Sequence, residues 1–286
     1  MFINGDWVDA HSGETFEVTN PATGEKIGEM PDGSAVDAER AVAAADAAFG
    51  AWSTTTAFAR AEILMRAWQL MNERADDLAH LMTTEQGKPL KAARFEVGYG
   101  ADFLRWFAEE ARRLTGEWLP SARPDQRFLS VRQPVGVVAA ITPWNDPMSM
   151  LTRKMGPALA AGCTMVLKPA EATPLCAKAI FEILAEAGVP AGVMNMVTAS
   201  EPAPIGDVLT SDRRVKKLTF TGSTAVGKML AGKAASSLQR VSVELGGHAP
   251  FIVYPDADPE QAAKGAAALK FLNSGQACIS PNRLYV

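Results

Sequence analysis

Glu244 and Cys278 are the residues of this chain with the clearest potential for covalent chemistry. A cysteine can carry an acyl group covalently, and a carboxylate can activate the water molecule that removes it. Taken alone, most cysteines are small buried hydrophobes and most glutamates are solvated surface charges. The two residues therefore indicate acyl transfer only in combination with the sequences around them.

Those flanking sequences are Val243-Glu-Leu-Gly-Gly-His-Ala-Pro250 and Asn273-Ser-Gly-Gln-Ala-Cys-Ile-Ser-Pro-Asn282. Both resemble the active-site signatures of the aldehyde dehydrogenase superfamily, and the resemblance extends from Ile3 to the last residue. It implies NAD(P)-dependent oxidation of an aldehyde to the carboxylic acid through a cysteine thiohemiacetal and a thioester. Family members are considerably longer, so the resemblance also implies the amino-terminal part of such an enzyme. The alternative is a truncated, catalytically inactive nucleotide-binding fragment.

Asn145, in Thr142-Pro-Trp-Asn-Asp146, is the third residue of the implied mechanism. An asparagine in such a run is commonly a turn residue. In the family, the matching asparagine donates its amide to the oxyanion that forms when the thiolate attacks the aldehyde, with the backbone N–H of Cys278 as the second donor. Glu244 then activates water to hydrolyse the thioester. The resemblance thus implies catalytic roles for Asn145, Glu244 and Cys278.

A glycine-containing turn, Gly222-Ser-Thr-Ala-Val-Gly227, follows an expected strand and opens a helix. Its N–H groups and the helix dipole can face a phosphate, although simple helix capping is an equally good interpretation. The turn and Lys228 also have P-loop spacing, but Met229 replaces the Ser or Thr that would hold Mg²⁺, which argues against phosphoryl transfer. The G-x-G-x-x-G fingerprint is absent. The resemblance places a dinucleotide pyrophosphate near Ser223.

Lys168-Pro-Ala-Glu171 ends an earlier strand with one cation and one carboxylate, which can also form an ordinary exposed salt bridge. The resemblance assigns both residues to the adenosine ribose. A carboxylate there repels a 2′-phosphate, so NAD is the expected cofactor and NADP the alternative. The residues expected at the cofactor are Ile141, Thr142, Pro143, Trp144, Lys168, Glu171, Gly222, Ser223, Val226, Gly227 and Leu245.

The expected substrate is a small semialdehyde, because three runs look most like succinate-semialdehyde dehydrogenases: Trp106-Phe-Ala-Glu-Glu-Ala111, Leu151-Thr-Arg-Lys154 and Gly246-Gly-His-Ala-Pro-Phe251. In that branch an arginine at the position of Arg153 helps to hold the substrate carboxylate. Leu272 departs from the branch, since it stands where a second arginine is found. Asp146 also departs, because it replaces an aromatic residue. We expect Asp146 either to pair with Arg153 or to repel an anionic substrate.

A cysteine hydrolase is the other chemical alternative for Cys278. Such an enzyme needs an imidazole beside the thiol. The chain has three histidines, His11, His80 and His248, and their places in the sequence do not assemble a triad. The sequence therefore favours the dehydrogenase.

The elements that must position these residues alternate along the second half of the chain. Strands are expected at 135–141, 164–167, 193–197, 217–220 and 240–243, with helices that begin near Met148, Thr173, Pro204 and Ser223. This alternation predicts an α/β fold with a Rossmann-like, doubly wound parallel sheet. Ligands of such sheets bind beyond the carboxyl ends of the strands, where the motifs above fall.

The first half of the chain predicts a small strand layer over the first thirty residues, with Val8, Phe16, Val18 and Ile27 in its strands. Long helices follow, and we expect the last of them to carry Phe103, Trp106 and Phe107 into the core. Residues 1–115 and 135–246 are expected to form the NAD-binding domain. Residues 116–134 would form an extended β arm for homo-oligomerisation in the full-length form, and 247–286 the truncated start of a second α/β domain for catalysis.

Composition excludes several other classes of protein. The 286 residues are 48% hydrophobic with a net charge of −4, which is typical of a globular protein. The absence of a basic block argues against nucleic acid and anionic membranes as partners. Apolar runs are shorter than the roughly 20 residues of a membrane span, and the start does not resemble a signal peptide, so a cytoplasmic location is expected. Three cysteines without CxxC spacing support neither a disulfide framework nor a metal site.

Overall fold

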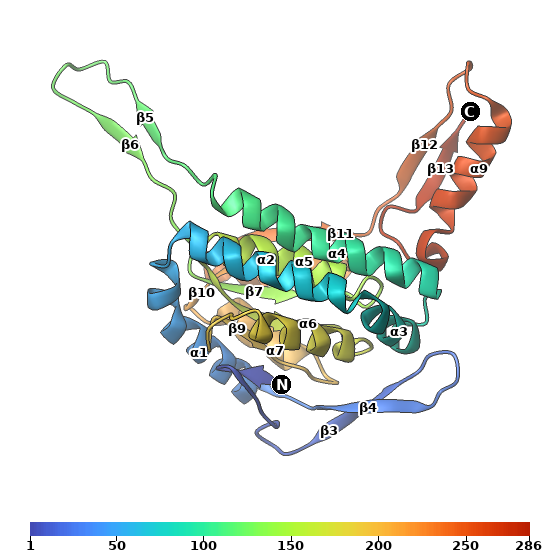
Figure 1. The fold of residues 1–286 in the computed structure, drawn as a ribbon, viewed down its shortest axis with the longest axis horizontal. Helices are drawn as coiled ribbons and strands as arrows, with labels where there is room; N and C mark the ends of the chain where they lie inside the picture. The colour runs from blue at the N-terminus through green and yellow to red at the C-terminus, as the bar shows by residue number, and fades with distance from the viewer.

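A central seven-stranded sheet organises the computed structural model, which describes residues 1–286 (Figure 1). The strand order is β11-β10-β7-β8-β9-β1-β2, and the strands from β11 to β9 are mutually parallel. Their bounds lie close to the predicted ones: β7 (Val137–Ile141), β8 (Thr164–Lys168), β9 (Met194–Met196), β10 (Val215–Gly222) and β11 (Arg240–Leu245).

Helices cover both faces of this sheet. Those that connect the parallel strands are α5 (Ser149–Ala160), α6 (Pro174–Glu186), α7 (Ala203–Ser211) and α8 (Thr224–Ser236). Because neighbouring side chains of a strand point to opposite faces, Val138 and Ala140 join one apolar core with α5 and α6, whereas Val137 and Ala139 join a second core with α7 and α8. The predicted doubly wound α/β sheet is therefore confirmed.

The amino-terminal strands do not form one layer, so that expectation was wrong. β1 (Phe2–Ile3) and β2 (Asp6–Trp7) extend the main sheet in antiparallel pairing, whereas β3 (Thr15–Thr19) and β4 (Lys26–Pro31) form a separate hairpin. Asn4 and Gly5 both have positive φ and reverse the chain between β1 and β2. Val8, which was expected in a strand, lies just beyond β2, and its carbonyl accepts a hydrogen bond from the amino group of Met1.

Four helices follow β4 in sequence: α1 (Ala35–Ser53), α2 (Ala57–Glu73), α3 (Ala75–Gln86) and α4 (Leu90–Ala111). α4 packs against α2, α3 and α5. Phe103 and Phe107 are half-buried, but Trp106 is 60% exposed, so its predicted place in the core was wrong. The buried stripe of α4 contains Leu104, and a residue two positions later points away from that stripe.

Two segments project from the same side of the body (Figure 1). One is the hairpin of β5 (Glu117–Leu119) and β6 (Phe128–Ser130), on which Trp118 and Leu129 are exposed. The other contains β12 (Ala249–Ile252), α9 (Pro259–Lys270), a short 3-10 turn (Leu272–Gly275) and β13 (Pro281–Tyr285), which pairs in parallel with β12. Their assignment to an arm and a second domain stays a prediction. None of the helices is both long and apolar enough to cross a membrane.

A buried carboxyl group joins α3 to α6. The side chain of Glu85 accepts hydrogen bonds from the backbone N–H groups of Leu175 at 2.6 Å and Cys176 at 2.8 Å, in the first turn of α6. Burial raises the pKa of Glu85 to about 7, and the hydrogen bonds from Cys176 and Leu175 oppose the rise. The free energy of unfolding should therefore depend on the ionisation of this group.

Replacing Glu85 with Gln should remove that pH dependence. A carboxyl group whose pKa is raised by folding contributes stability below its unfolded pKa, near 4.5, and loses it as the pH rises through about 7. Between pH 4.5 and pH 7, the free energy of unfolding of the parent should therefore fall by about 3 kcal/mol relative to that of Glu85→Gln. Urea unfolding at several pH values measures the difference, with the exposed Glu73→Gln as the control. Parallel pH profiles for the parent and Glu85→Gln would contradict the assignment.

Candidate active site

The carboxyl ends of the parallel strands bring the predicted cofactor residues to one edge of the sheet. The register pairs Ile141 of β7 with Lys168 of β8 and Phe220 of β10, and it pairs Gly222 of β10 with Leu245 of β11. Thr142, Pro143, Trp144, Glu171 and Ser223 follow these strand ends directly in the sequence. The sheet thus assembles one continuous site from four separate strand ends.

The turn between β10 and α8 contains both a helix cap and backbone N–H groups without a partner inside the helix. Ser223 caps α8 through its hydroxyl, which accepts a hydrogen bond from the N–H of Val226 at 3.3 Å. The N–H groups of Thr224 and Ala225 have no intrahelical partner and point out of the helix start. A Cβ at Gly222 would lie 2.5 Å from the ring of Phe220, so packing under the turn requires glycine there. Capping and phosphate binding are therefore compatible in this turn.

Lys168 and Glu171 form an ion pair at the end of β8. The lysine side chain is 4% exposed and the glutamate side chain 37% exposed, so this is not an ordinary surface pair. Burial lowers the pKa of Lys168, and the charge of Glu171 opposes this shift. The exposed part of the Glu171 carboxylate can accept further hydrogen bonds from a ligand.

Two buried hydroxyl groups at the same edge have no hydrogen-bond partner in the protein, those of Thr142 and Thr221. Buried polar groups are normally hydrogen-bonded, so unpartnered hydroxyls beside an open helix start are typical of a ligand site. With the carboxylate of Glu171, they give this edge the donors and acceptors that a dinucleotide requires. The residues present therefore fit such a cofactor.

Cys278 lines a cavity of about 860 Å³ between α4, the start of α5 and the segment from Phe271 to Ile279. Arg153, Asp146 and Leu272 line the same cavity, so the predicted nucleophile and the predicted substrate residues meet. Cys278 itself is exposed. None of the three histidines lines the cavity, which leaves the thiol without an imidazole partner there.

Arg153 makes no ion pair within the chain. Its guanidinium donates a hydrogen bond to the hydroxyl of Tyr99 at 2.7 Å and lies over the ring of Phe103, 4.9 Å from its centroid. Such contacts hold the planar group in place without neutralising it. The positive charge of Arg153 is therefore available to an anion in the cavity.

Of the two expectations for Asp146, pairing with Arg153 was wrong, and repulsion of an anionic substrate stays a prediction. Asp146 instead accepts a hydrogen bond from the ammonium of Lys88, 3.0 Å away, and Lys88 also pairs with Glu96. The lysine side chain is 2% exposed, and a buried ammonium without partners is far more costly than a partly exposed guanidinium. The high cost of leaving the buried Lys88 ammonium unpaired explains why Asp146 pairs with Lys88 and not with Arg153.

Asn145 is tied to the segment that carries Cys278. Its side-chain Nδ2 donates to the carbonyl of Gln276 at 2.7 Å and to Asp146 at 3.2 Å. The side chain of Asn273 donates in turn to the carbonyl of Asn145 at 2.9 Å. The structure thus brings Asn145 to the cysteine segment, whereas Glu244 lies exposed on β11 and does not line the cavity.

Lys154 is a residue at this site that sequence reasoning missed. It lies buried on α5 and donates to the hydroxyl of Thr219 on β10 at 2.9 Å. Burial lowers the pKa of Lys154 to about 8, and the nearby charge of Glu244 opposes the shift. The sequence holds no distinct signal for this role, because Lys154 follows Arg153 directly and the ammonium groups of helical lysines commonly reach solvent.

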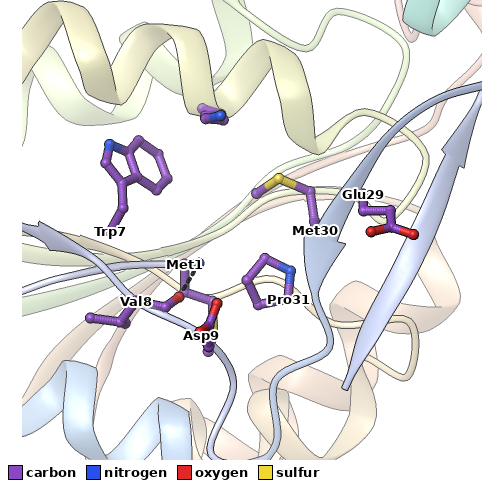
Figure 2. Close-up of a pocket in the computed structure, with 8 residues that line it drawn as sticks. Met1, Trp7, Val8, Asp9, Glu29, Met30 and Pro31 are labelled. Carbon is purple, nitrogen blue, oxygen red and sulfur yellow. Dashed lines mark hydrogen bonds between the residues drawn. The ribbon is translucent and has the colours of Figure 1, made fainter. Parts of the chain in front are cut away.

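A second cavity, of about 190 Å³, lies on the amino-terminal side of the molecule and contains none of the predicted site residues. It is lined by residues of the first strands, including Met1, Trp7 and Met30 (Figure 2). The chemistry-bearing side chains therefore gather at the carboxyl edge of the sheet and in the larger cavity.

Comparison with known proteins agrees with this arrangement. A sequence profile described as the aldehyde dehydrogenase family matches residues 7–286. The chain belongs to the aldehyde dehydrogenase family.

Individual aldehyde dehydrogenases are similar over the whole chain. Glutarate-semialdehyde dehydrogenase of Pseudomonas putida is 53% identical over 285 residues, which is 100% of this chain and 59% of that protein. Succinate-semialdehyde dehydrogenase [NADP(+)] of Escherichia coli is 54% identical over 99% of this chain and 59% of its own length. The crystal structure of an E. coli NADP dependent enzyme superposes with a TM-score of 0.98 at 53% identity, covering 100% of this chain and 59% of the other. The chain spans about 59% of the length of these relatives.

Proposed function

We propose that this chain supplies the cofactor edge and the nucleophile for the NAD-dependent oxidation of a small anionic semialdehyde to its acid. The observation that carries this proposal is the cavity shared by Cys278 and the unpaired cation Arg153. With a thiol and a fixed guanidinium in one cavity, an aldehyde whose acid group binds the arginine can present its carbonyl to the sulfur.

We infer a sequence of steps at named atoms, the last of which requires Glu244, exposed on β11 outside the cavity, to reach the thioester. Cys278 Sγ adds to the aldehyde carbon, and the resulting oxyanion accepts hydrogen bonds from Asn145 Nδ2 and the backbone N–H of Cys278. NAD, when bound at Ser223 and Glu171, supplies the acceptor for the hydride that leaves this carbon. Glu244 then removes a proton from water, whose oxygen attacks the thioester and releases the acid and the Cys278 thiolate, which starts the next cycle.

Asn145 must give up its hydrogen bond to Gln276 before it can donate to the oxyanion. One of its N–H groups is bound to the carbonyl of Gln276, at 2.7 Å, and this is the group that faces the cysteine segment. A substrate oxygen would have to replace that carbonyl as the acceptor. The exchange costs little because one hydrogen bond replaces another.

Relatives support an anionic substrate. Their names include glutarate-semialdehyde dehydrogenase, succinate-semialdehyde dehydrogenase and 3-sulfolactaldehyde dehydrogenase, each named for an aldehyde that carries an acid group. Arg153 offers the matching charge in this chain, while Leu272 offers apolar contact to the rest of the substrate.

Reduction of NAD with a series of aldehydes tests the proposal. Succinate semialdehyde should be oxidised with a higher kcat/KM than butanal, an uncharged aldehyde with the same number of carbons. Equal rates would exclude a role for the arginine charge. NAD binding without any reduction would instead favour the second candidate, a nucleotide-binding unit in which the exposed Cys278 has no finished pocket.

We also propose that the β5–β6 hairpin pairs with a second copy of the protein. Its strands are short, their outer edges are unpaired, and Trp118, Leu129 and Val131 are each more than half exposed. An apolar hairpin of this kind gains stability when another chain covers it. Sedimentation velocity of the enzyme measures the resulting oligomer.

Replacing Glu171 with Ser should relax the preference for NAD. The carboxylate at the end of β8 repels a 2′-phosphate and a serine hydroxyl does not, so kcat/KM with NADP should rise by about tenfold or more. Lys168, released from its ion pair, can then meet the phosphate. Steady-state kinetics with both cofactors measure the ratio, with the exposed Glu182→Gln as the control. An unchanged ratio would place the preference elsewhere.

A further inference from the structure

The two oxygens of the Asp146 carboxylate have different partners. Oδ1 accepts a hydrogen bond from the ammonium of Lys88 at 3.0 Å, and Oδ2 accepts one from Nδ2 of Asn145 at 3.2 Å. Asn273 adds a longer contact to Oδ1 at 3.4 Å. The carboxylate therefore bridges a buried cation and the proposed oxyanion donor.

Lys88 is itself held rigidly. Its other partner is Glu96 of α4, whose second oxygen accepts the backbone N–H groups of Met148 at 3.0 Å and Ser149 at 3.1 Å, at the start of α5. Lys88 and Glu96 are both buried. Two helices thus fix the ammonium, and the ammonium fixes the position of Asp146.

This chain of contacts selects one orientation of the Asn145 side chain. A carboxamide can turn over and present either its oxygen or its NH₂ group to a neighbour, but a carboxylate only accepts hydrogen bonds. Asp146 therefore stabilises the orientation in which Nδ2 faces it. The same orientation directs the second N–H at the cysteine segment, where it now meets the carbonyl of Gln276.

We propose that Asp146, held by Lys88, is a positioning residue that fixes the Asn145 carboxamide with one N–H directed toward Cys278. The inference rests on the proposed function and deepens it, because an oxyanion donor with the wrong end of its amide in place would repel the oxyanion. Asp146 is half-buried, and its Oδ2 contacts Asn145 directly while Oδ1 is held by Lys88, so we expect its effect to act through Asn145.

The isosteric variant Asp146→Asn separates the two bonds without a change of shape. Asparagine has one side-chain oxygen, and the Lys88 ammonium, which can only donate, retains it. The new NH₂ group then faces the NH₂ group of Asn145, so the Asn145 amide must turn over or move. We expect the single-turnover rate of NAD reduction to fall by about tenfold, with KM for the aldehyde and the dissociation constant of NAD within about twofold of the parent.

A double-mutant cycle with Asn145→Ala tests whether the effect passes through Asn145. In the Asn145→Ala background, Asp146→Asn should have no further effect on the single-turnover rate. An equal loss in both backgrounds, or a loss confined to KM, would overturn the positioning role and assign Asp146 a direct charge effect on the substrate. The exposed Asp77→Asn, outside the network, is the matched control.

Failure of the proposed function gives a different result from failure of this inference. A parent enzyme that reduces no NAD with any aldehyde overturns both. A parent that is active, with Asp146→Asn equally fast, overturns the positioning role alone. Circular dichroism of Asp146→Asn should match the parent, because the substitution preserves the volume and one acceptor of a half-buried side chain.

Discussion

Cys278→Ser should abolish the proposed formation of acid, with a loss of at least about a thousandfold in kcat. A serine hydroxyl is a far weaker nucleophile than a thiolate unless a base activates it, and no histidine lines the cavity that contains Cys278. Since Cys278 is exposed, the substitution should leave the fold and NAD binding intact. Steady-state NADH formation and NAD titration measure the two properties separately.

The matched control for this experiment is Cys163→Ser. Cys163 is a buried thiol outside the cavity, so its replacement should lower the free energy of unfolding while leaving the chemical step in place. Undiminished turnover in Cys278→Ser would refute the covalent mechanism.

Glu244→Gln should allow one round of hydride transfer and then stop. If Glu244 activates the water that hydrolyses the thioester, its amide cannot accept the proton, and acyl enzyme accumulates. We expect a burst of about one equivalent of NADH per site, followed by a steady-state rate reduced by about a hundredfold. Rapid mixing with absorbance detection resolves the two phases.

Glu201→Gln, which replaces an exposed glutamate just before α7, serves as the control and should show parental kinetics. A Glu244→Gln enzyme with no burst and an unchanged rate would show that another group is the base. Loss of the burst itself would instead place Glu244 in the hydride-transfer step or in cofactor binding, which its position at the end of β11 also permits.

Local patterns in the sequence predicted the elements of the sheet closely. Short β-branched runs are followed by amphipathic helices, and two of those helices begin at residues with a strong local preference, Thr173-Pro174 and Ser223. These signals depend on a few neighbouring residues, so they can be recognised without any tertiary information. The parallel topology then follows, and with it the shared edge of Ile141, Lys168 and Leu245.

Partnerships between distant residues could not be predicted in the same way. Asp146 pairs with Lys88, 58 positions away in the sequence, because an unpaired ammonium is costlier when it is buried than the partly exposed guanidinium of Arg153 is. The lowered pKa of Lys154 likewise depends on the packing of α5 against β10. The face on which Trp106 lies depends on which side of α4 meets α2 and α5. In each case, the energy depends on burial, which is a property of the assembled chain.

The sequence by itself determined the family resemblance, the doubly wound sheet and the residue types at the strand ends, because motifs and hydrophobic periodicity are local. Only the tertiary structure decided which of these groups meet: Cys278 with Arg153 in one cavity, Asn145 with Gln276 of the cysteine segment, and Glu244 outside the cavity. The physical reason is that hydrogen bonds and ion pairs act over a few ångströms, whereas their partners here come from the loop before α4, from α4 and α5, and from the segment after α9.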